Sequence, residues 1–569
     1  IPDAKGRVTT IRRIRRGLEK EDLANVKETL VCELHEESGA LLREVQRAAA
    51  QPTLENRKAS IPDLADKVDN ILGQAWEIVL EQVGETIEIN HDRPGPRRRV
   101  QTGFLKRTQA QRYKSGLGAI TQIRKALRKL GAEGEGTAID ADEVRELLGL
   151  PRTGEIGFRE APVGDLKALA RDRLQQAKVE TRKILEAHDK DMRLKRVQHF
   201  RRMLDVNPKK AHRYIFESGE KKPLDHVRLA TGEVSADPGT VIREVERTYG
   251  ERQQPVVTPE AAADFPWDVS RSEGASLIRN SGGTTERIST RYNEQVFRDC
   301  LSRLPGWKAP GPDGVPNEVI KFLPKKFHDA LYALFALMLE GSNTPGNWKD
   351  DITVLLYKKG DPGLVANHRP IGLKRSIYKL WTSVVTRILT DYIEEKGLLS
   401  KAQAGFRRQK RTHHQLQRLI LALEDAKLSK SNIQVLYVDF VDAFGSVDHT
   451  RLHEIMGAMG IPQDAIDLIK DLYEGASIVV RTPVGDTKSI PIKGKGTIQG
   501  DTLSPLLFLI YVNPLLEWLE EGDCKYRLKS SEESVGSMAF ADDLVAVTED
   551  PVQVHTQAHK ISSYCAWAG

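Results

Sequence analysis

The sequence is poor in cysteine and has no long apolar run. Its 569 residues contain four cysteines, which are scattered and form neither a CxxC pair nor a cluster with histidine. This spacing argues against a zinc finger within the chain and is typical of a reducing compartment. No apolar stretch approaches the ~20 residues that a membrane-spanning helix needs, and no signal peptide is recognisable. We therefore expect no membrane partner.

An excess of one charge sign is also missing. The chain has 86 Lys and Arg against 80 Asp and Glu, so the formal net charge of +6 says little about a nucleic-acid partner. The basic residues are nevertheless clustered, in residues 12–16, 97–99 and 182–213. A single cluster of this kind can be a solvated helix face. If the chain binds nucleic acid, the clusters are candidate phosphate contacts, because cationic side chains gain affinity by releasing counterions.

Helical periodicity dominates the first half of the chain. Apolar residues recur at helical spacing in residues 18–50 and again after Pro62. We interpret residues 1–180 as a helical region of unknown role and 181–256 as a basic helical linker that binds nucleic acid. Residues 257–290, rich in Pro, Gly, Ser and Thr, have the composition of a flexible linker. The chain starts at Ile1, and we expect it to be a segment of a longer protein.

Strands and helices alternate in the second half of the chain, which indicates an α+β domain. We predict strands at residues 354–357, 434–440, 537–540 and 544–547, with helices over most of the remainder.

An acidic hairpin is the strongest local signal. In SMAFADDLVAV (residues 537–547), two short apolar segments flank a tight turn that carries Asp542 and Asp543. Carboxylate oxygens are the ligands that a hard cation such as Mg²⁺ prefers. An ordinary solvated Asp-Asp turn is the alternative for this segment alone.

A second carboxylate ends another apolar segment. QVLYVDF (residues 434–440) predicts a buried strand with Asp439 near its end, a costly position unless a metal or another partner compensates. Carboxylates on two adjacent strands can hold two ions about 3.5–4 Å apart, as in phosphoryl transfer. Phe444, five residues after Asp439, could form a bulky wall beside such a metal.

A glycine-rich loop lies between these segments in the sequence. GTIQGDTLSP (residues 496–505) precedes an apolar stretch, and Ser504-Pro505 is a good helix start. Its glycines allow close approach of backbone, although a loop before a core helix would look the same.

The order VDFVDAF, GTIQGDTLSP and AFADD resembles motifs A, B and C of reverse transcriptases. Three upstream segments sharpen the resemblance to the enzymes of non-LTR (LINE-type) retrotransposons: KAPGPDGVP at 308–316, YKKGDP with HRPIGL at 357–373, and QAGFR at 403–407. Residues 181–256 resemble the linker that precedes the polymerase in such elements. A group II intron maturase shares the Asp-Asp motif and is the nearest alternative.

The resemblance implies the fold and the roles of individual residues. It implies right-hand fingers in residues 291–430 and a palm in 431–569, an antiparallel sheet backed by helices, with the thumb beyond the chain. The implied metal ligands and catalytic residues are Asp439, Asp542 and Asp543, holding two Mg²⁺ ions with Mn²⁺ as a substitute. The implied substrate-binding residues are Lys358, Lys359, Arg369, Phe444, Gln499 and Gly500. Arg407 and Arg408 would contact the template.

The implied activity is RNA-directed DNA polymerisation, target-primed on nicked chromosomal DNA in the nucleus. The partners would be an RNA template, a DNA primer or target, and dNTPs. One departure stands out: many relatives read AFDSV where this chain has Gly445 in AFGSV. A decayed or domesticated copy that only binds nucleic acid is therefore a second alternative, although all three carboxylates are present.

Overall fold

The computed structural model describes residues 8–14, 20–90, 122–123, 125, 169–177, 223–253, 265, 285–306, 308–498 and 500–569. The chain divides into two compact units: Ile1–Arg7 with Asn90–Glu220, and Val8–Ile89 with Lys221–Gly569. In the first unit, residues 169–177 are helical. The predicted basic stretches 97–99 and 182–213, and most of the predicted linker 257–290, lie outside the described residues. Everything below concerns the second unit.

A three-stranded antiparallel sheet joins the two acidic segments. Its order is β13 (Ser537–Phe540), β14 (Asp543–Thr548) and β7 (Gln434–Asp439). Three helices pack on these strands: α14 (Thr412–Ser429), α17 (Ser504–Glu520) and α18 (Pro551–Ala568). The three strands and the helix start at Ser504 confirm the sequence predictions. Burial of β7 is only partial, however, because Tyr437 and Asp439 are exposed and the other residues of the strand are half-buried.

A second sheet of five strands is built from two separate stretches of chain. β5 (Asp351–Tyr357) pairs antiparallel with β6 (His368–Lys374) and parallel with β8 (Ser477–Thr482). β8 also pairs with β9 (Gly485–Asp486) and β10 (Ile490–Pro491). The predicted strand 354–357 is thus the second half of β5.

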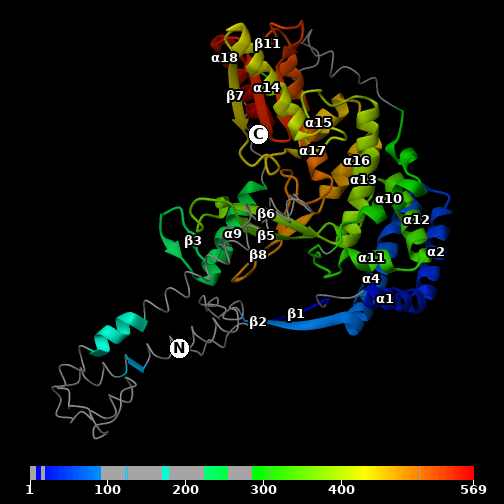
Figure 1. Ribbon diagram of the computed structural model, residues 1–569. Coiled ribbons are helices and arrows are strands. Elements are labelled where there is room, and N and C mark those ends of the chain that lie inside the picture. Colours follow the sequence, from blue (N-terminus) through cyan, green and yellow to red (C-terminus); the bar gives the residue numbers. More distant parts are fainter. Residues whose placement is uncertain are drawn as a thin grey trace, which may run out of the picture. The chain divides into compact units, whose positions relative to one another are not determined.

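Helix α9 (Pro238–Arg252) packs against β8, β9 and β10 (Figure 1). Asp237 caps its N-terminus by accepting a 2.8 Å hydrogen bond from the N–H of Thr240, and Pro238 suits the first helical turn. Its buried residues Val241, Val245 and Tyr249 share a core with the five-stranded sheet. The last turn of α9 is therefore held firmly over that sheet.

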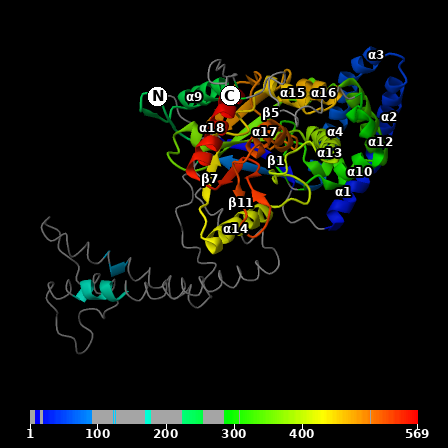
Figure 2. The same cartoon turned by 90° about the horizontal axis from the view of Figure 1, so that it is seen from above.

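The N-terminal helices belong to the same hydrophobic core as the rest of the second unit. On α4 (Ile61–Val83), Leu64, Val68, Leu72 and Ala75 are buried at helical spacing, as the sequence predicts. In Figures 1 and 2, α2 (His35–Ala49) lies beside α12 (Lys325–Gly341), which it contacts, and α4 contacts both α12 and α11 (Asn317–Phe322). Residues 20–83, which the sequence grouped into a helical region of unknown role, therefore contribute to this core.

The other described helices of the second unit are α1 (Lys20–Glu33), α2 (His35–Ala49), α3 (Leu54–Ala59), α10 (Glu294–Arg303), α11 (Asn317–Phe322), α12 (Lys325–Gly341), α13 (Ser376–Glu395), α15 (His449–Ala458) and α16 (Gln463–Tyr473). The short elements are β1 (Val8–Ile14), β2 (Gly84–Asn90), β3 (Val227–Arg228), β4 (Val234–Ser235), β11 (Tyr526–Arg527), β12 (Ser534–Val535), η3 (Ile288–Arg291), η4 (Gly346–Trp348) and η5 (Val365–Asn367). The described helices include none that is long and apolar enough to cross a membrane.

Candidate active site

The three predicted carboxylates lie at one end of the three-stranded sheet. Asp439, the last residue of β7, is directly opposite Asp543, the first residue of β14. Because Phe540 pairs with Asp543, only Ala541 and Asp542 form the hairpin turn between β13 and β14. The prediction that adjacent strands bring Asp439 and the Asp-Asp hairpin together is confirmed. Asp439 and Asp543 are exposed and Asp542 is half-buried, so burial of Asp439 is no argument for a metal here.

A buried glutamine holds the tip of this hairpin. The Gln403 side-chain oxygen accepts hydrogen bonds of 2.8 Å from the N–H groups of Ala541 and Gly405. Its side-chain nitrogen donates to the carbonyl oxygen of Ala541 at 3.2 Å. Ala541 has φ = 58°, a left-handed conformation that costs a residue with a Cβ about 1–2 kcal/mol. Gln403, fully buried, thus stabilises an unfavourable turn next to Asp542.

Gly405 allows the chain to come this close to the turn. A Cβ at Gly405 would lie 2.9 Å from the Cα of Ala541 and even closer to its nitrogen. The sequence signal was the QAGFR segment, but a hairpin-holding role for Gln403 and Gly405 did not follow from it. Their partners are far away in the sequence.

Three carboxylates of the same charge lie close together in this site. Burial raises the pKa of Asp543 above its ordinary value, and the neighbouring Asp542 and Asp439 raise it further. Within the described ranges, no ion pair of Lys, Arg or His with these three carboxylates occurs, and no group of three or more His, Cys, Asp or Glu side chains is arranged to hold a metal ion. Mg²⁺ commonly takes one or two protein carboxylates and completes its shell with water and substrate phosphates. Three carboxylates that repel one another and do not enclose a metal by themselves are compatible with such a cation.

Phe444 is fixed from two sides. Its ring lies 5.2 Å from the ring of Phe508 on α17, and its carbonyl oxygen accepts a 2.7 Å hydrogen bond from the N–H of Thr497. The predicted motifs A and B are therefore in direct contact. Between Asp439 and Phe444, Asp442 adopts φ = 53°, so the chain turns sharply after β7.

The loop at 496–505 approaches the five-stranded sheet. Gly500 has φ = 113°, and a Cβ there would lie 2.7 Å from the carbonyl oxygen of Gly372 on β6. Only glycine suits both the conformation and the contact. Gly500 is exposed and can face a ligand, whereas Gln499 lies outside the described residues.

Residues 357–569 match the family model described as reverse transcriptase (RNA-dependent DNA polymerase). This segment is a reverse transcriptase domain. The resemblance seen in the motifs is thereby confirmed, and all three carboxylates fall within the matched segment.

Curated relatives agree with this assignment. A probable RNA-directed DNA polymerase from transposon BS of Drosophila melanogaster is 29% identical over 219 residues, 38% of this chain and 24% of the relative. A Pol polyprotein from the type-1 retrotransposable element R2 of Popillia japonica is 27% identical over 278 residues, 48% and 37% of the two chains. The RNA-directed DNA polymerase from mobile element jockey of Drosophila melanogaster is 27% identical over 258 residues, 45% and 27%. The chain thus spans between 24% and 37% of the length of these relatives.

The predicted phosphate-binding residues lie on the β5–β6 hairpin of the reverse transcriptase domain. Lys358 and Lys359 follow β5 directly, and Arg369 lies on β6 opposite Leu356. All three are exposed. In the part of the chain that the structure describes, no hydrogen bond or ion pair joins them to Asp439, Asp542 or Asp543. Their triphosphate role stays a prediction.

The two predicted template arginines of the domain differ sharply. Arg407 donates two hydrogen bonds, of 2.9 and 2.8 Å, to the carboxylate of Glu394 and a third, of 2.7 Å, to the carbonyl oxygen of Ser400. Its side chain is only 9% exposed. The Arg408 side chain is 51% exposed and pairs with Asp391 at 2.5 Å. The hydrogen bonds of Arg407 therefore stabilise the fold, and Arg408 is more accessible to a template than Arg407 is.

Proposed function

We propose that the chain is the polymerase part of a non-LTR retrotransposon reverse transcriptase, which adds dNTPs to a DNA primer on an RNA template. The observation that carries this proposal is the pairing of Asp439 with Asp543 beside Asp542, on a hairpin tip held by Gln403. The matched relatives named as RNA-directed DNA polymerases support it.

Asp439, Asp542 and Asp543 are the residues that would hold two Mg²⁺ ions, with Mn²⁺ as a substitute. Bound there, the ions would stabilise the charge on the attacking and leaving oxygens. The protein holds the three carboxylates at the end of one sheet against their mutual repulsion, which adds to the effect of burial in raising the pKa of Asp543. A cation in the site would relieve that repulsion.

The β5–β6 hairpin and the loop at 496–505 are the proposed nucleotide contacts. Arg369 can bind a triphosphate with two parallel hydrogen bonds, while Lys358 and Lys359 act as point charges. Gly500 and Gln499 would line the pocket shared by template and dNTP. Phe444 would exclude a 2′-hydroxyl by steric overlap. In this arrangement β5 and β6 belong to the fingers, and the three-stranded sheet belongs to the palm.

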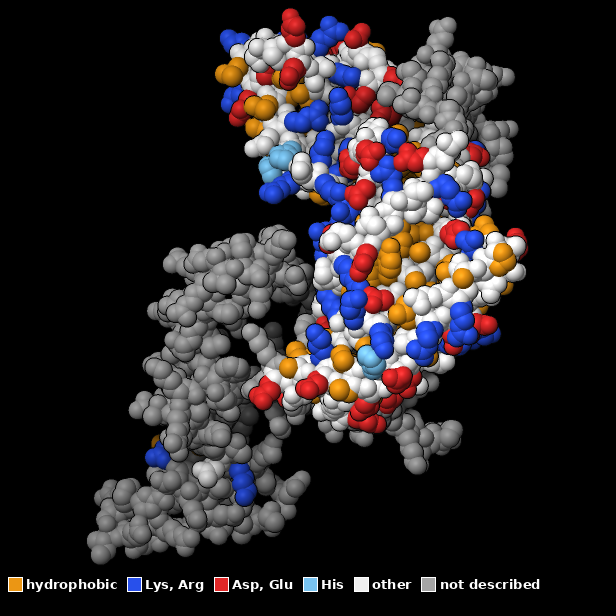
Figure 3. All heavy atoms as spheres, turned by 90° about the vertical axis from the view of Figure 1, so that its right-hand side faces the viewer, with side chains coloured by type: hydrophobic (Ala, Val, Ile, Leu, Met, Phe, Trp, Pro, Cys, Tyr) orange, Lys and Arg blue, Asp and Glu red, His pale blue; other side chains and the backbone are white. Residues whose placement is uncertain are grey.

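A groove next to this pocket is the proposed template path. It has a volume of about 810 Å³ and includes Gly372, Gly500 and the ring of Phe406, a residue 59% exposed. Its charged lining residues are Arg303, Lys308, Lys379, Arg387, Arg408, Asp299 and Asp501. Cations of this kind attract phosphates, and an exposed ring can stack on a base. On the face in Figure 3, Lys and Arg side chains are mixed with Asp and Glu around a patch of exposed apolar side chains.

The names of the relatives support a wider proposal. Transposon and retrotransposable-element proteins must reach chromosomal DNA, so we propose that the primer is a chromosomal nick and that the protein acts in the nucleus. Extension of a nicked DNA duplex annealed to an RNA template, compared with a blunt duplex, tests the primer. Equal use of both would contradict target priming.

Primer extension on poly(rA)/oligo(dT) with Mg²⁺ tests the polymerase assignment. Asp439→Asn and Asp542→Asn should each lower the rate on the order of a hundredfold or more, at about 1.4 kcal/mol per decade. Asp467→Asn, on an exposed carboxylate of α16, is the matched control and should keep normal activity. Equal rates for wild type and Asp542→Asn would overturn the assignment. An inactive wild type that still binds RNA would favour the decayed-copy alternative.

A further inference from the structure

Helix α9 ends beside the turn that follows Asp439, although α9 lies outside the matched reverse transcriptase segment. Arg252, its last residue, forms an ion pair with Asp442. The two side chains are 25% and 24% exposed, so solvent screens the pair only partly. The contact spans nearly two hundred residues of sequence and reaches the segment between Asp439 and Phe444.

Gly445 provides the space for this ion pair. A Cβ at Gly445 would lie 2.8 Å from the Nε of Arg252 and would overlap the Asp442 carboxylate. Real Cβ contacts essentially never fall below 3.0 Å. A Cβ at residue 445 would therefore force the Asp442 or the Arg252 side chain to shift from its position in the ion pair.

The turn at residues 440–446 needs restraints because Asp442 is left-handed. On one side, the Phe444 carbonyl oxygen is held by Thr497, and the Val447 carbonyl oxygen accepts a 2.7 Å hydrogen bond from the N–H of Gly496. Inside the turn, the N–H of Ser446 donates to the Asp442 carbonyl oxygen at 2.9 Å. Arg252 supplies a further restraint, through its ion pair with the Asp442 side chain.

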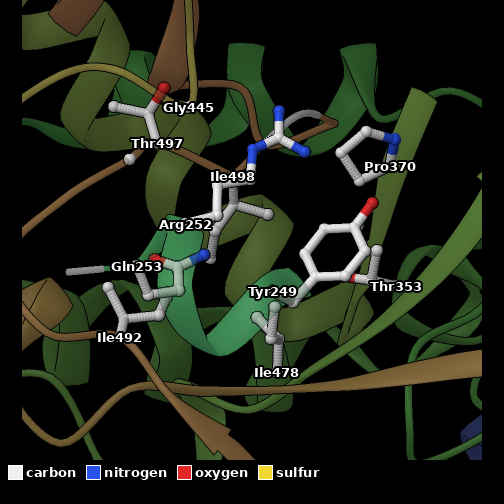
Figure 4. Close-up of a pocket in the computed structure, with 12 residues that line it drawn as sticks. Tyr249, Arg252, Gln253, Thr353, Pro370, Gly445, Ile478, Ile492, Thr497 and Ile498 are labelled. Atoms are coloured by element: carbon white, nitrogen blue, oxygen red, sulfur yellow. The ribbon is translucent and has the colours of Figure 1, made fainter. Parts of the chain in front are cut away.

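The end of α9 faces a small cavity next to the same turn. The cavity has a volume of about 40 Å³, and its lining includes Tyr249, Arg252 and Gln253 together with Gly445 and Thr497. Figure 4 shows these α9 side chains pointing into one space with Pro370 and Thr497. Among the described residues, the buried Tyr249 hydroxyl and Gln253 side-chain oxygen have no hydrogen-bond partner of good geometry. The end of α9 thus lies between the five-stranded sheet and the turn at residues 440–446.

We propose that Arg252 is a positioning residue of the nucleotide site, which holds residues 440–446 in one conformation through its ion pair with Asp442. The inference rests on the proposed polymerase function, in which Phe444 meets the sugar of the incoming nucleotide. A fixed turn gives Phe444 a fixed ring position, and only a fixed ring rejects a 2′-hydroxyl reliably. Without the Arg252–Asp442 ion pair, the enzyme should bind dNTPs more weakly and accept rNTPs more readily.

Two substitutions break the pair in different ways. Arg252→Met removes the charge of residue 252 and keeps its apolar stem. Gly445→Ala keeps the charges of Arg252 and Asp442 but adds a methyl group where their ion pair lies. Two others are matched controls. Arg247→Met removes an arginine of the same helix that pairs with Glu244 and Glu251, and Gly250→Ala adds a Cβ where nothing lies within 4 Å. Arg252→Lys should rescue partially, because Lys keeps the charge without the planar fork.

Primer extension by the full natural protein gives the first measurement, the ratio of kcat/KM for a dNTP to that for the matching rNTP. Arg252→Met and Gly445→Ala should lower this ratio about tenfold, mainly through a higher KM for the dNTP. This is less than the ~10²-fold that a displacement of about 1 Å can cost catalysis. Hydrogen–deuterium exchange of residues 440–446 gives the second measurement and should become faster in both variants. Melting temperature checks that each variant is folded.

The outcomes separate the two proposals. Wild-type ratios and exchange rates in folded Arg252→Met and Gly445→Ala would overturn the positioning role and leave the polymerase assignment intact. A loss of the same size in Arg247→Met would also overturn it, because the effect would then belong to α9 as a whole. A wild type that extends no primer would overturn the proposed function and the positioning role with it.

Discussion

Arg407 and Arg408 are adjacent residues with different environments. Arg407→Met would leave Glu394 without its bidentate partner in a mostly buried place, and we expect a loss of about 3 kcal/mol in the free energy of unfolding. Arg408→Met should leave stability nearly unchanged. It should weaken binding of an RNA template and reduce the slope of log K against log salt by about 1, as expected for one phosphate contact.

Chemical denaturation and RNA binding at several salt concentrations measure these two effects. Each arginine variant is the control for the other. If Arg407→Met kept full stability and lost the salt-dependent contact, the template role that the sequence predicted for Arg407 would be restored.

Phe444 allows a prediction about sugar choice. Phe444→Val should keep much of the dNTP activity and raise kcat/KM for rNTPs on the order of tenfold or more, because a smaller side chain no longer overlaps a 2′-hydroxyl. Phe444→Tyr is the control, because it keeps an aromatic ring at the same position and should keep rejecting rNTPs. A folded, active Phe444→Val enzyme that rejects rNTPs as strongly as wild type would show that the wall lies elsewhere.

At the scale of the elements, the β13–β14 hairpin depends on a residue outside it. Gln403→Met would leave the N–H groups of Ala541 and Gly405 buried without an acceptor, at a cost of about 1–3 kcal/mol each. Because Asp542 follows Ala541 directly, we also expect a large fall in kcat. Gln415→Met is a close control: Gln415 donates to Ala402 at 2.7 Å and to Ala539 at 3.2 Å but does not touch the turn.

Steady-state kinetics and denaturation of both variants separate stability from catalysis. Both should lose stability, and only Gln403→Met should lose most of its kcat. Similar kcat values in the two variants would mean that the turn keeps its shape without Gln403.

How far the sequence predicted the structure also depends on the element. Alternating apolar residues predicted β13, β14, β7 and the second half of β5, and helical spacing predicted the buried face of α4. The three carboxylates were found because two strand ends carry them. Local patterns of this kind need no knowledge of the partner segment.

The features that the sequence did not predict depend on tertiary packing. The family resemblance implied a template contact for Arg407, and no local pattern identifies its partners Glu394 and Ser400, which lie 13 and 7 residues earlier. Gln403 and Arg252 act on segments 138 and 190 residues away, respectively. Residues 20–83 were grouped with an unassigned region because helical periodicity identifies a buried face but not what covers it.

For the molecule as a whole, Asp69 connects the N-terminal helices to the core. On α4 it accepts hydrogen bonds from the indole of Trp348 at 3.1 Å and from Asn347 at 2.8 Å, and it pairs with Arg375 at 3.5 Å. Burial raises the pKa of Asp69 from 3.8 to about 6, against the opposing effect of Arg375. The folded protein therefore holds this proton more tightly than the unfolded chain does.

The raised pKa of Asp69 makes the free energy of unfolding depend on pH. Between about pH 4 and pH 6 the folded state binds more protons than the unfolded state, so the free energy of unfolding falls as pH rises. At about 1.4 kcal/mol per pKa unit, the full effect is about 3 kcal/mol. Asp69→Asn should lack this contribution, so its stability relative to wild type should improve by up to about 3 kcal/mol from pH 4 to pH 7.

Denaturation curves at a series of pH values measure this difference. Asp63→Asn, an exposed position on the same helix, should run parallel to wild type. A constant difference between Asp69→Asn and wild type across this range would show that the N-terminal helices are not coupled to the core through Asp69.

The two sheets alternate along the chain, and this has a consequence during synthesis. The ribosome delivers β5 and β6 of one sheet, then β7 of the other, then β8 to β10 of the first, and finally β13 and β14 of the second. A nascent chain that has just exposed β7 therefore carries two unfinished sheet edges at once, and neither can close before later residues emerge. Asp439 therefore gains its partner Asp543 only when the hairpin that ends at Thr548 has been synthesised, and a chain that stops before this hairpin lacks the paired carboxylates.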